Sequence, residues 1–303
     1  MIGLRLNGWD GSVWDLRFGP VRATSDGIEG LGGLNFEVFV QETAARHGQR
    51  MTGWRGKPRD FLLPVLFGPF PDEGSWTSIS RRWWKIMRPD KYNTLVITHP
   101  DGTERMLDIR FVDDGAVASN RDPTRDLIET FPIRLVADNP WFYGKSFGRK
   151  FKAAPPAGPT APGVNFFGGL PVDPAVPGKG TPLVLGASQR TSQNEYTNPG
   201  DDDAWPTYTF GQMDRFTARL GTGIVSASSL VVEDGETLTV ETSPLRQVAL
   251  LTRVDGTVVN VTRRLDGWGF RPVPAGSKQT ILLDVDGRGD YEVSLIPHFF
   301  RGW

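Results

Sequence analysis

The sequence predicts a mainly β protein of two domains, with one amphipathic helix in the first domain and a β-sandwich as the second. Three observations predict this class. The chain has 303 residues, about twice the usual length of a single domain. Its 36 Gly and 24 Pro favour frequent turns and few helices. Asp-Gly pairs separate short runs of alternating apolar residues, as tight hairpin turns require.

The Asp-Gly pairs locate the predicted hairpins. In the first half, residues 94–99 and 103–112 form two alternating strands around Asp101-Gly102. In the second half, short strands recur at the spacing of a sandwich. They are residues 230–232, 237–242, 247–254, 257–262, 280–285 and 291–296, and the pairs stand at 10–11, 26–27, 101–102, 114–115, 234–235, 255–256, 266–267 and 286–287.

One segment has helical rather than strand periodicity. Trp76, Ile79, Trp83 and Ile86 are three or four residues apart, which places them on one face of a helix. Ser75 is the predicted N-cap, and the proline at position 89 ends the helix. We expect this helix to lie on a sheet.

A change in composition predicts the domain boundary. Residues 151–182 are rich in Pro, Gly and Ala and have few apolar anchors, so we expect a crossing segment without a core of its own. The predicted division is residues 1–150 for the first domain, 151–182 for the crossing segment and 183–303 for the sandwich.

Composition excludes several classes of protein. With 34 Lys+Arg against 35 Asp+Glu, the chain lacks the basic excess of a protein that grips nucleic acid, so we expect no specific nucleic-acid binding. The absence of Cys excludes disulfides and thiolate metal sites. The first ten residues soon turn polar, and no segment approaches the roughly 18 apolar residues of a membrane helix, so we expect neither a secretory signal nor a membrane span.

No catalytic constellation is evident, and we expect no enzyme activity, no cofactor and no metal. The histidines are His47, His99 and His298, and none stands in a zinc-binding or nucleophile-elbow motif. Residues 284–290 carry alternate aspartates, but the loop lacks the further oxygen ligands of a calcium-binding EF-hand. A hairpin turn is the preferred interpretation.

Carbohydrate binding is the main alternative suggested by the residues themselves. Trp205, Trp268 and Trp303 could form a stacking platform on a sandwich, either in a carbohydrate-binding protein or in an accessory protein of glycan degradation. Paired carboxylates for glycoside hydrolysis depend on a separation that the sequence does not give. A bacterial cell-surface adhesion module is a third possibility, disfavoured by the missing export signal.

Three stretches of the sequence are distinctive in combination, and they are residues 48–66, residues 135–144 and residues 198–206. Together they resemble the distal tail proteins, often called minor tail proteins, of long-tailed phages that infect actinobacteria. The resemblance covers nearly the whole chain and ends with Pro297–Trp303.

The resemblance implies a structural role. Distal tail proteins form a ring, commonly of six subunits, at the distal end of the tail in the virion. Each subunit has a tail-tube-like β domain with one helix and a galectin-like β-sandwich. The ring joins the tail tube protein to the tail hub protein of the baseplate and to peripheral proteins such as receptor-binding proteins, and contact with the tape measure protein is a further expectation.

A strand near residue 38 is the expected contact element between subunits. Leu34, Phe36, Val38 and Val40 alternate with polar neighbours and Phe39, which suits a strand with one buried face and one face toward a neighbour or a lumen. Aromatic and arginine side chains dominate interface energetics. The predicted oligomer-interface residues are Phe39, Arg50, Trp54 and Arg55.

Overall fold

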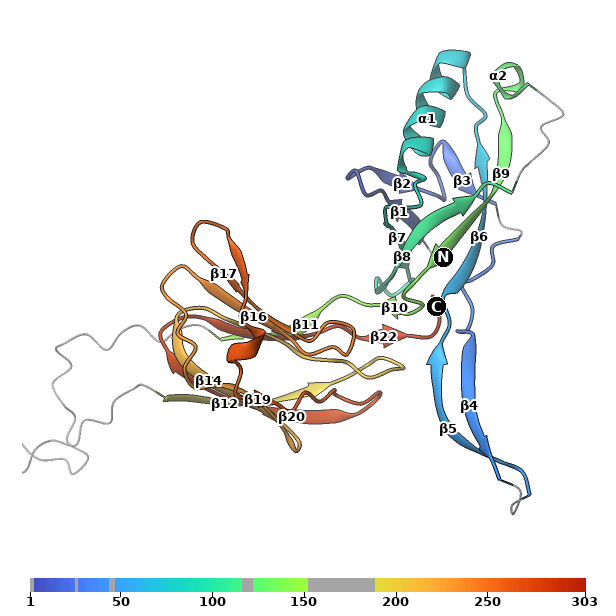
Figure 1. Cartoon of the computed structure of the whole chain (residues 1–303). Helices are drawn as coiled ribbons and strands as arrows, with labels where there is room; N and C mark the ends of the chain where they lie inside the picture. The colour runs from blue at the N-terminus through green and yellow to red at the C-terminus, as the bar shows by residue number, and fades with distance from the viewer. Residues whose placement is uncertain (1–2, 25–26, 44–46, 116–121, 152–188) are drawn as a thin grey trace, which may run out of the picture. The chain divides into compact units, whose positions relative to one another are not determined.

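The computed structural model describes residues 3–24, 27–43, 47–115, 122–151 and 189–303. It divides into a first unit, Met1–Lys145 with Pro297–Trp303, and a second unit, Ser146–Ile296. Figure 1 shows the elements of each unit. The fold class predicted from the sequence, mainly β with a helix in the first unit and a sandwich as the second, is confirmed.

The first unit is built on a strongly curved antiparallel sheet with the strand order β2-β1-β7-β8-β9-β6-β3. The register of residues 94–99 against 103–112 follows the prediction, with Leu95 opposite Leu107. The strands of this unit are β1 (Gly3–Asn7), β2 (Val13–Asp15), β3 (Val21–Ala23), β4 (Phe36–Glu42), β5 (Gln49–Gly56), β6 (Arg59–Phe67), β7 (Asn93–Thr98), β8 (Glu104–Asp113), β9 (Glu129–Ala137), β10 (Phe142–Tyr143) and β22 (His298–Phe299).

Helix α1 (Glu73–Ile86) packs one face into the core of the first unit. Trp83 and Ile86 are fully buried, and Trp76 and Ile79 pack against the same cluster, as their spacing predicts. The Trp83 ring meets the Trp14 ring edge to face at 5.2 Å. Burial of such large side chains drives folding of the unit.

The helix begins earlier than the sequence predicts, and Ser75 is not its N-cap. The cap is Asp72, whose carboxylate accepts hydrogen bonds from the Ser75 backbone amide at 2.8 Å and the Ser75 hydroxyl at 2.7 Å. Both Asp and Ser are good caps, and the aspartate three residues earlier takes the position because it can satisfy the free amide of the first turn. In the described part of the chain no helix is long and apolar enough to cross a membrane.

Two further helical turns accompany α1 in the described residues, where the sequence predicts one helix alone. They are α2 (Pro123–Asp126) and a 3-10 turn, η1 (Thr262–Arg264). Asp122 accepts a hydrogen bond from the Thr124 amide at 3.0 Å. An N-cap residue followed by proline at the first helical position is a signal for the start of a helix. A helix of a single turn is too short to show the periodicity from which helices are predicted.

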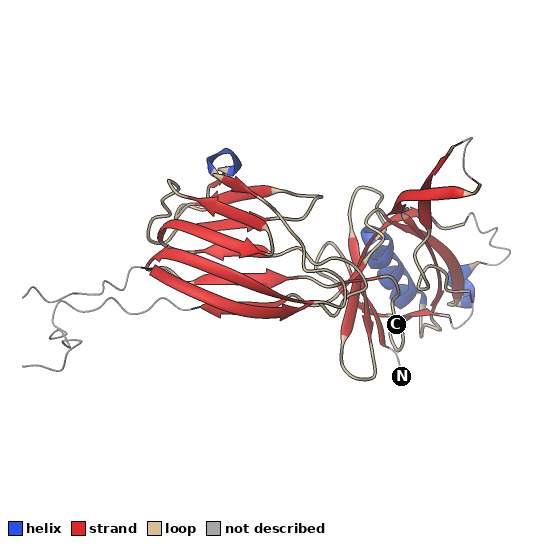
Figure 2. Cartoon of the chain, turned by 90° about the horizontal axis from the view of Figure 1, so that it is seen from below, coloured by secondary structure: helices blue, strands red, loops and turns tan. Residues whose placement is uncertain are grey.

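The second unit is a β-sandwich. One sheet has the order β11-β21-β13-β16-β17-β18 and the other β12-β20-β14-β15-β19. Strands fill the described part of this unit, with helix confined to η1 (Figure 2). The strands are β11 (Phe147–Phe151), β12 (Gln189–Thr197), β13 (Thr207–Phe210), β14 (Met213–Leu220), β15 (Gly223–Ala227), β16 (Thr237–Glu241), β17 (Val248–Thr252), β18 (Val258–Asn260), β19 (Gly267–Trp268), β20 (Lys278–Gly287) and β21 (Tyr291–Leu295).

Side chains that alternate along the strands of these two sheets point inward and form a second core, separate from that of the first unit. Tyr208 and Phe210 on β13 and Phe216 on β14 are buried, and the Phe210 and Phe216 rings lie 4.3 Å apart. Residues 230–232, predicted as a strand, contribute an isolated bridge between Val232 and Met213. Strands β12 to β15 have no counterpart among the predicted strands.

The units differ in their bounds from the predicted domains. Phe147 and Phe151 pack against the core of the second unit, and β11 pairs with β21, so the first unit ends at Lys145 rather than at residue 150. The Pro-rich stretch therefore follows β11 inside the second unit instead of separating the units; its residues 152–182 lie outside the described part. Pro297–Trp303 belongs to the first unit, not to the sandwich.

Four of the eight Asp-Gly pairs form the expected turns, and one member of the pair at 26–27 lies outside the described residues. Gly102 and Gly256, for example, have φ values of +83° and +82°, which glycine adopts without strain. Gly267 and Gly287 lie within strands instead. A Cβ on Gly287 would stand 2.5 Å from the Gln212 carbonyl oxygen, so this glycine permits close approach of two backbones. The four turn glycines are Gly11, Gly102, Gly235 and Gly256, and Gly27 and Gly115 also have a positive φ.

A buried arginine connects distant parts of the first unit. Arg59 at the start of β6 is 4% exposed. Its Nη1 donates to the carbonyl oxygens of Gly30 and Gly32, both at 2.7 Å, its Nη2 to Phe300 at 2.8 Å, and its Nε to Pro140 at 3.0 Å. Burial lowers the pKa of Arg59 to about 10, so the guanidinium stays protonated at neutral pH. One side chain thus joins β6 to three segments.

Replacing Asp72 tests the helix cap. The Ser75 amide, followed by the Ser75 hydroxyl, holds the pKa of Asp72 below its ordinary value of 3.8. A lowered carboxyl pKa stabilises the folded state above the unfolded pKa, and this contribution is lost as the pH falls through the folded pKa. Asp72→Asn keeps a capping oxygen but does not titrate. We expect its free energy of unfolding to lie below that of wild type near pH 6, and the difference to shrink as the pH falls below 3.8 in urea titrations. A difference that does not change with pH would contradict this account.

Replacing Arg59 tests the buried arginine. Arg59→Met fills similar space but leaves four carbonyl oxygens without their donors, and we expect the free energy of unfolding of the first unit to fall by about 3 kcal/mol or more. The matched control is Arg134→Met on β9, where the side chain is largely exposed and lies 3.8 Å from Asp113. We expect a loss of under about 1 kcal/mol there. Equal losses in urea denaturation would refute the role given to Arg59.

Candidate interaction surface

A two-stranded hairpin projects from the body of the first unit. Strands β4 and β5 pair with each other and, among the described residues, with no other strand (Figure 1). Gly48 has a φ of +82° in the turn directly before β5. An isolated two-stranded hairpin is marginally stable in water, so a ribbon of this length needs further contacts.

The register divides the hairpin side chains between two faces. Val38 lies opposite Trp54 and Val40 opposite Met51, whereas Glu37 lies opposite Arg55. Residues opposite each other in an antiparallel pair share a face, and neighbours along a strand alternate. We call one side the apolar face, formed by Phe36, Val38, Val40, Met51 and Trp54, and the other the charged face, formed by Glu37, Phe39, Gln41, Arg50 and Arg55.

The apolar face is exposed. Its five large side chains are between 42% and 53% accessible, and they follow one another along the length of the ribbon. Scattered apolar side chains are normal on a protein surface, but a contiguous patch with a polar opposite side marks an interaction site. The predicted buried face of this strand is therefore not buried in the described chain: Leu34 is buried, but Phe36, Val38 and Val40 are not.

The charged face is held by side-chain contacts within the hairpin. Arg55 Nε donates to Glu37 Oε2 at 2.7 Å, and its guanidinium carbon lies 5.7 Å from the centroid of the Phe39 ring. The register shifts between Phe39 and Val40, and the Thr52 hydroxyl donates to the Phe39 carbonyl oxygen at 3.1 Å. Such a bulge increases the twist of the ribbon.

Four rings gather where the hairpin joins the body, and we call them the aromatic base. The Phe36 ring meets the Trp54 ring edge to face at 5.1 Å and the Phe300 ring edge to face at 5.5 Å. Trp141 lies 6.1 Å from Trp54 and 5.1 Å from Phe300. Edge-to-face and tilted aromatic pairs contribute attraction beyond their buried area. The base thus joins both hairpin strands to two other segments.

A backbone contact next to the aromatic base completes the attachment. The Lys57 amide donates to the Asn35 carbonyl oxygen at 2.9 Å. A Cβ on Gly56 would stand 2.9 Å from the Leu34 side chain and 3.2 Å from the Pro140 ring, so a larger residue here would have to displace these side chains.

All four predicted interface residues lie on the hairpin, but not on one face. Phe39, Arg50 and Arg55 belong to the charged face, and Trp54 belongs to the apolar face and the aromatic base. Whether they contact another subunit stays a prediction. The prediction omitted Val38, Val40 and Met51, although the alternation of the strand marked the two valines.

The residues considered for other chemistry are dispersed. Trp303 belongs to the first unit, whereas Trp205 and Trp268 belong to the second. Trp268 is half-exposed, and its indole N–H donates to the Leu265 carbonyl oxygen at 3.0 Å. Asp286 pairs with Arg215 at 3.3 Å. The described residues contain no group of three or more His, Cys, Asp or Glu placed to hold a metal.

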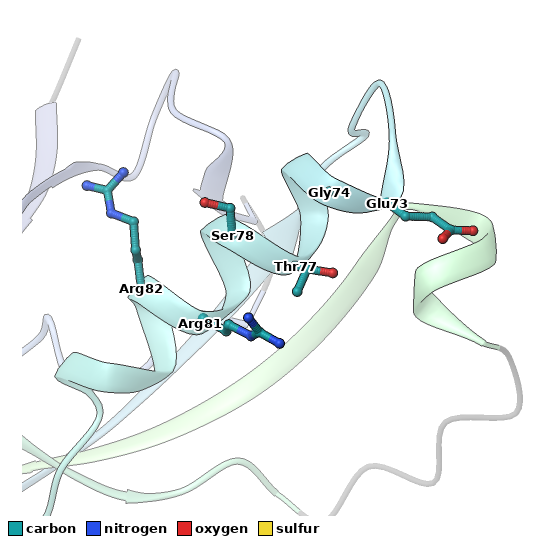
Figure 3. A pocket seen from close by; sticks show the side chains of 6 residues that line it. All are labelled: Glu73, Gly74, Thr77, Ser78, Arg81 and Arg82. Carbon is teal, nitrogen blue, oxygen red and sulfur yellow. The ribbon is translucent and has the colours of Figure 1, made fainter.

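A shallow hollow of about 590 Å³ lies on the outer side of α1. Figure 3 shows that the side chains of Arg81 and Arg82 leave the helix in different directions. Arg82 lies over the Trp14 ring at 5.4 Å. The lining is the exposed side of a single helix, with no nucleophile paired with a base. It consists of Glu73, Gly74, Thr77, Ser78, Arg81 and Arg82.

Comparison with known proteins shows the fold. No family model matches the chain, and no curated protein sequence matches it. Solved structures do. The Dit protein (gp 19.1) of phage SPP1, described as a paradigm of the hub adsorption apparatus in phages that infect Gram-positive bacteria, has a TM-score of 0.59 at 10% identity over 99% of both chains. Chains of the phage P2 baseplate in its activated conformation match with TM-scores of 0.51 (with Ca, 13% identity) and 0.54 (with Sr, 12% identity), over 98% of both chains. The two-unit β fold of this chain is therefore similar, along nearly its whole length, to that of a Dit protein.

Proposed function

We propose that this chain is a structural subunit of the distal end of a phage tail. In this proposal copies of the chain associate through the projecting hairpin into a closed ring, commonly of six subunits, in the virion. The ring joins the tail tube protein to the tail hub protein and supports peripheral proteins such as receptor-binding proteins. The chain has no catalytic role in it.

The exposed apolar face of the hairpin is the observation that carries the proposal. Val38, Val40 and Met51 have no place in the core of the first unit, and their exposure costs free energy that contact with another molecule would recover. An exposed apolar ribbon of this kind favours association with another molecule over a free monomer.

The similarity to Dit and baseplate chains supports a tail-tip location. It extends over 98% or more of this chain, so it includes both units and not the sandwich alone. Since these matches have 10–13% identity, they support a common architecture, and the assembly role is our inference from that architecture together with the hairpin.

The two faces of the hairpin suit a ring. A ring closes when each subunit presents two different surfaces that fit each other, so that the same contact repeats around an axis. The projecting hairpin can be one of these surfaces, because its apolar face can pack on the body of the next subunit while its charged face stays in contact with water. Arg50, Arg55 and Phe39 would then lie toward a lumen or at the rim of the contact.

Carbohydrate binding is the alternative function. The three tryptophans considered for it are divided between the units, with Trp303 in the first unit and Trp205 and Trp268 in the second. A sugar site on the second unit would depend on Trp268, which is half-exposed beside Phe270 at 6.2 Å.

Variants on opposite faces of β4 test the contact. We expect Val38→Asp to abolish self-association, because it places a charge in the centre of the apolar face, whereas Gln41→Asp on the charged face leaves association within about threefold of wild type. Light scattering after size-exclusion chromatography measures the assembly, and unchanged urea unfolding shows that both variants fold. If Val38→Asp assembles like wild type, the apolar face is not the contact.

Wild-type behaviour tests the proposed function itself. We expect a closed ring, either from the purified chain or once the tail tube protein is present, and no affinity for glycans. A map of the intact phage particle should place the chain as a collar at the tail end. A stable monomer that binds or cleaves a sugar polymer would instead establish the alternative.

A further inference from the structure

The segment Pro297–Trp303, which we call the return segment, brings the chain back to the first unit after the second unit is complete. Its strand β22 pairs with β10, with Phe299 opposite Phe142. The Gly302 amide donates to the Leu31 carbonyl oxygen at 3.0 Å. The segment is therefore a docked part of the first unit.

Arginines fix the return segment by its backbone. Arg59 donates to the Phe300 carbonyl oxygen, and Arg105 Nη1 donates to the carbonyl oxygens of Arg301 and Trp303, both at 2.8 Å. The Arg105 guanidinium also lies 4.1 Å from the centroid of the Phe299 ring. Charge-assisted hydrogen bonds of this kind are about twice as strong as neutral ones, so the path of the segment is well defined.

Two consecutive aromatic residues of the return segment pack in different places. Phe299 packs against the core of the first unit. Phe300, one residue later, contacts the rings of Phe36 and Trp141 in the aromatic base. Because Phe300 is not part of the core cluster, its ring stabilises the attachment of the hairpin rather than the body of the unit.

The hairpin depends on its base for its orientation. Outside the aromatic base, the side chains of β4 and β5 are exposed apart from the partly buried Glu37. Among the described strands, β4 and β5 pair with each other alone. A ribbon held at one end moves about that end unless packing there is complete. The ring from the return segment supplies part of that packing.

We propose that the return segment is a strap that locks the hairpin in the orientation needed for association. The strap docks only after residues 146–296 have been made, so a chain presents its apolar face in fixed geometry once both units are complete. Phe300 is the positioning residue, and Arg59 and Arg105 hold it in place. This inference rests on the proposed function, because the association that the strap prepares is the proposed ring contact. The coupling between strap and hairpin does not depend on that function.

Hydrogen exchange on monomers tests the coupling. The full chain is compared as Val38→Asp and as Val38→Asp with Phe300→Ala, so that association does not protect the hairpin. We expect amides of β4 and β5 to exchange at least about fivefold faster when Phe300 is truncated, because two aromatic contacts are lost. Amides of β6 and the urea unfolding of the first unit should change little. Unchanged exchange in β4 and β5 would overturn the proposal.

Control variants make the result specific. Phe18→Ala removes a ring that is 74% exposed and outside the aromatic base, and it should leave the hairpin unchanged. Trp141→Ala attacks the base from another segment and should reproduce the effect of Phe300→Ala. If Phe300→Ala prevents folding, Phe300→Leu takes its place, because it keeps apolar bulk. We then expect a smaller acceleration of exchange in β4 and β5, and the absence of any acceleration would overturn the proposed strap.

Measuring self-association distinguishes failure of the strap proposal from failure of the proposed function. In the wild-type background, Phe300→Ala should weaken ring formation while Phe18→Ala should not. If the wild-type chain forms no ring even with the tail tube protein, the proposed function fails, and the exchange experiment still decides the strap. If the ring forms and Phe300→Ala changes neither exchange nor assembly, the strap fails and the function stands.

Discussion

The Arg59 guanidinium is buried, and among the described residues its hydrogen-bond partners are carbonyl oxygens rather than a carboxylate. Moving a charge out of water is costly unless hydrogen bonds replace those to water, and here four carbonyl oxygens from three segments accept from one planar group. The guanidinium also lies 4.9 Å from the centroid of the Phe142 ring. The first unit can therefore close around Arg59 only when the loop at Gly30, the turn at Pro140 and the return segment are all in place, and the path of the hairpin depends on the same three segments.

This constraint explains how the first unit combines a rigid body with an exposed ribbon. The body has a fully packed core around Trp83, whereas the hairpin buries little of its own apolar surface. The division of the hairpin into an apolar and a charged face follows from strand alternation and the observed register, and no special geometry is needed. What makes the ribbon unusual is that the five large side chains of its apolar face stay about half exposed in the described chain.

The sequence predicted the elements whose signals are local. The alternation around Phe36 and the helical spacing of Trp76, Ile79 and Trp83 gave a strand and a helix at the right places. The exposure of Phe36 and Val38 could not be predicted, because it depends on what covers the face of a strand and not on the pattern of residues along it. Arg59 had a local signal that the prediction did not use, since it shares the inward phase of Phe61 and Leu63 on β6. The docking of Phe300 on Phe36 had none, because it joins distant parts of the chain and depends on how both units fold.

The pairing of β11 with β21 has a consequence for how this architecture can vary. Phe147, almost the first residue of the second unit, lies opposite Leu295, almost its last, so the chain enters and leaves the sandwich at adjacent points. A module whose two ends are neighbours can be exchanged for another, or enlarged, without moving the ends of its host. The sandwich is in this sense inserted into the chain of the first unit ahead of its final segment, so its strands and loops can change in length while the elements of the first unit keep their geometry.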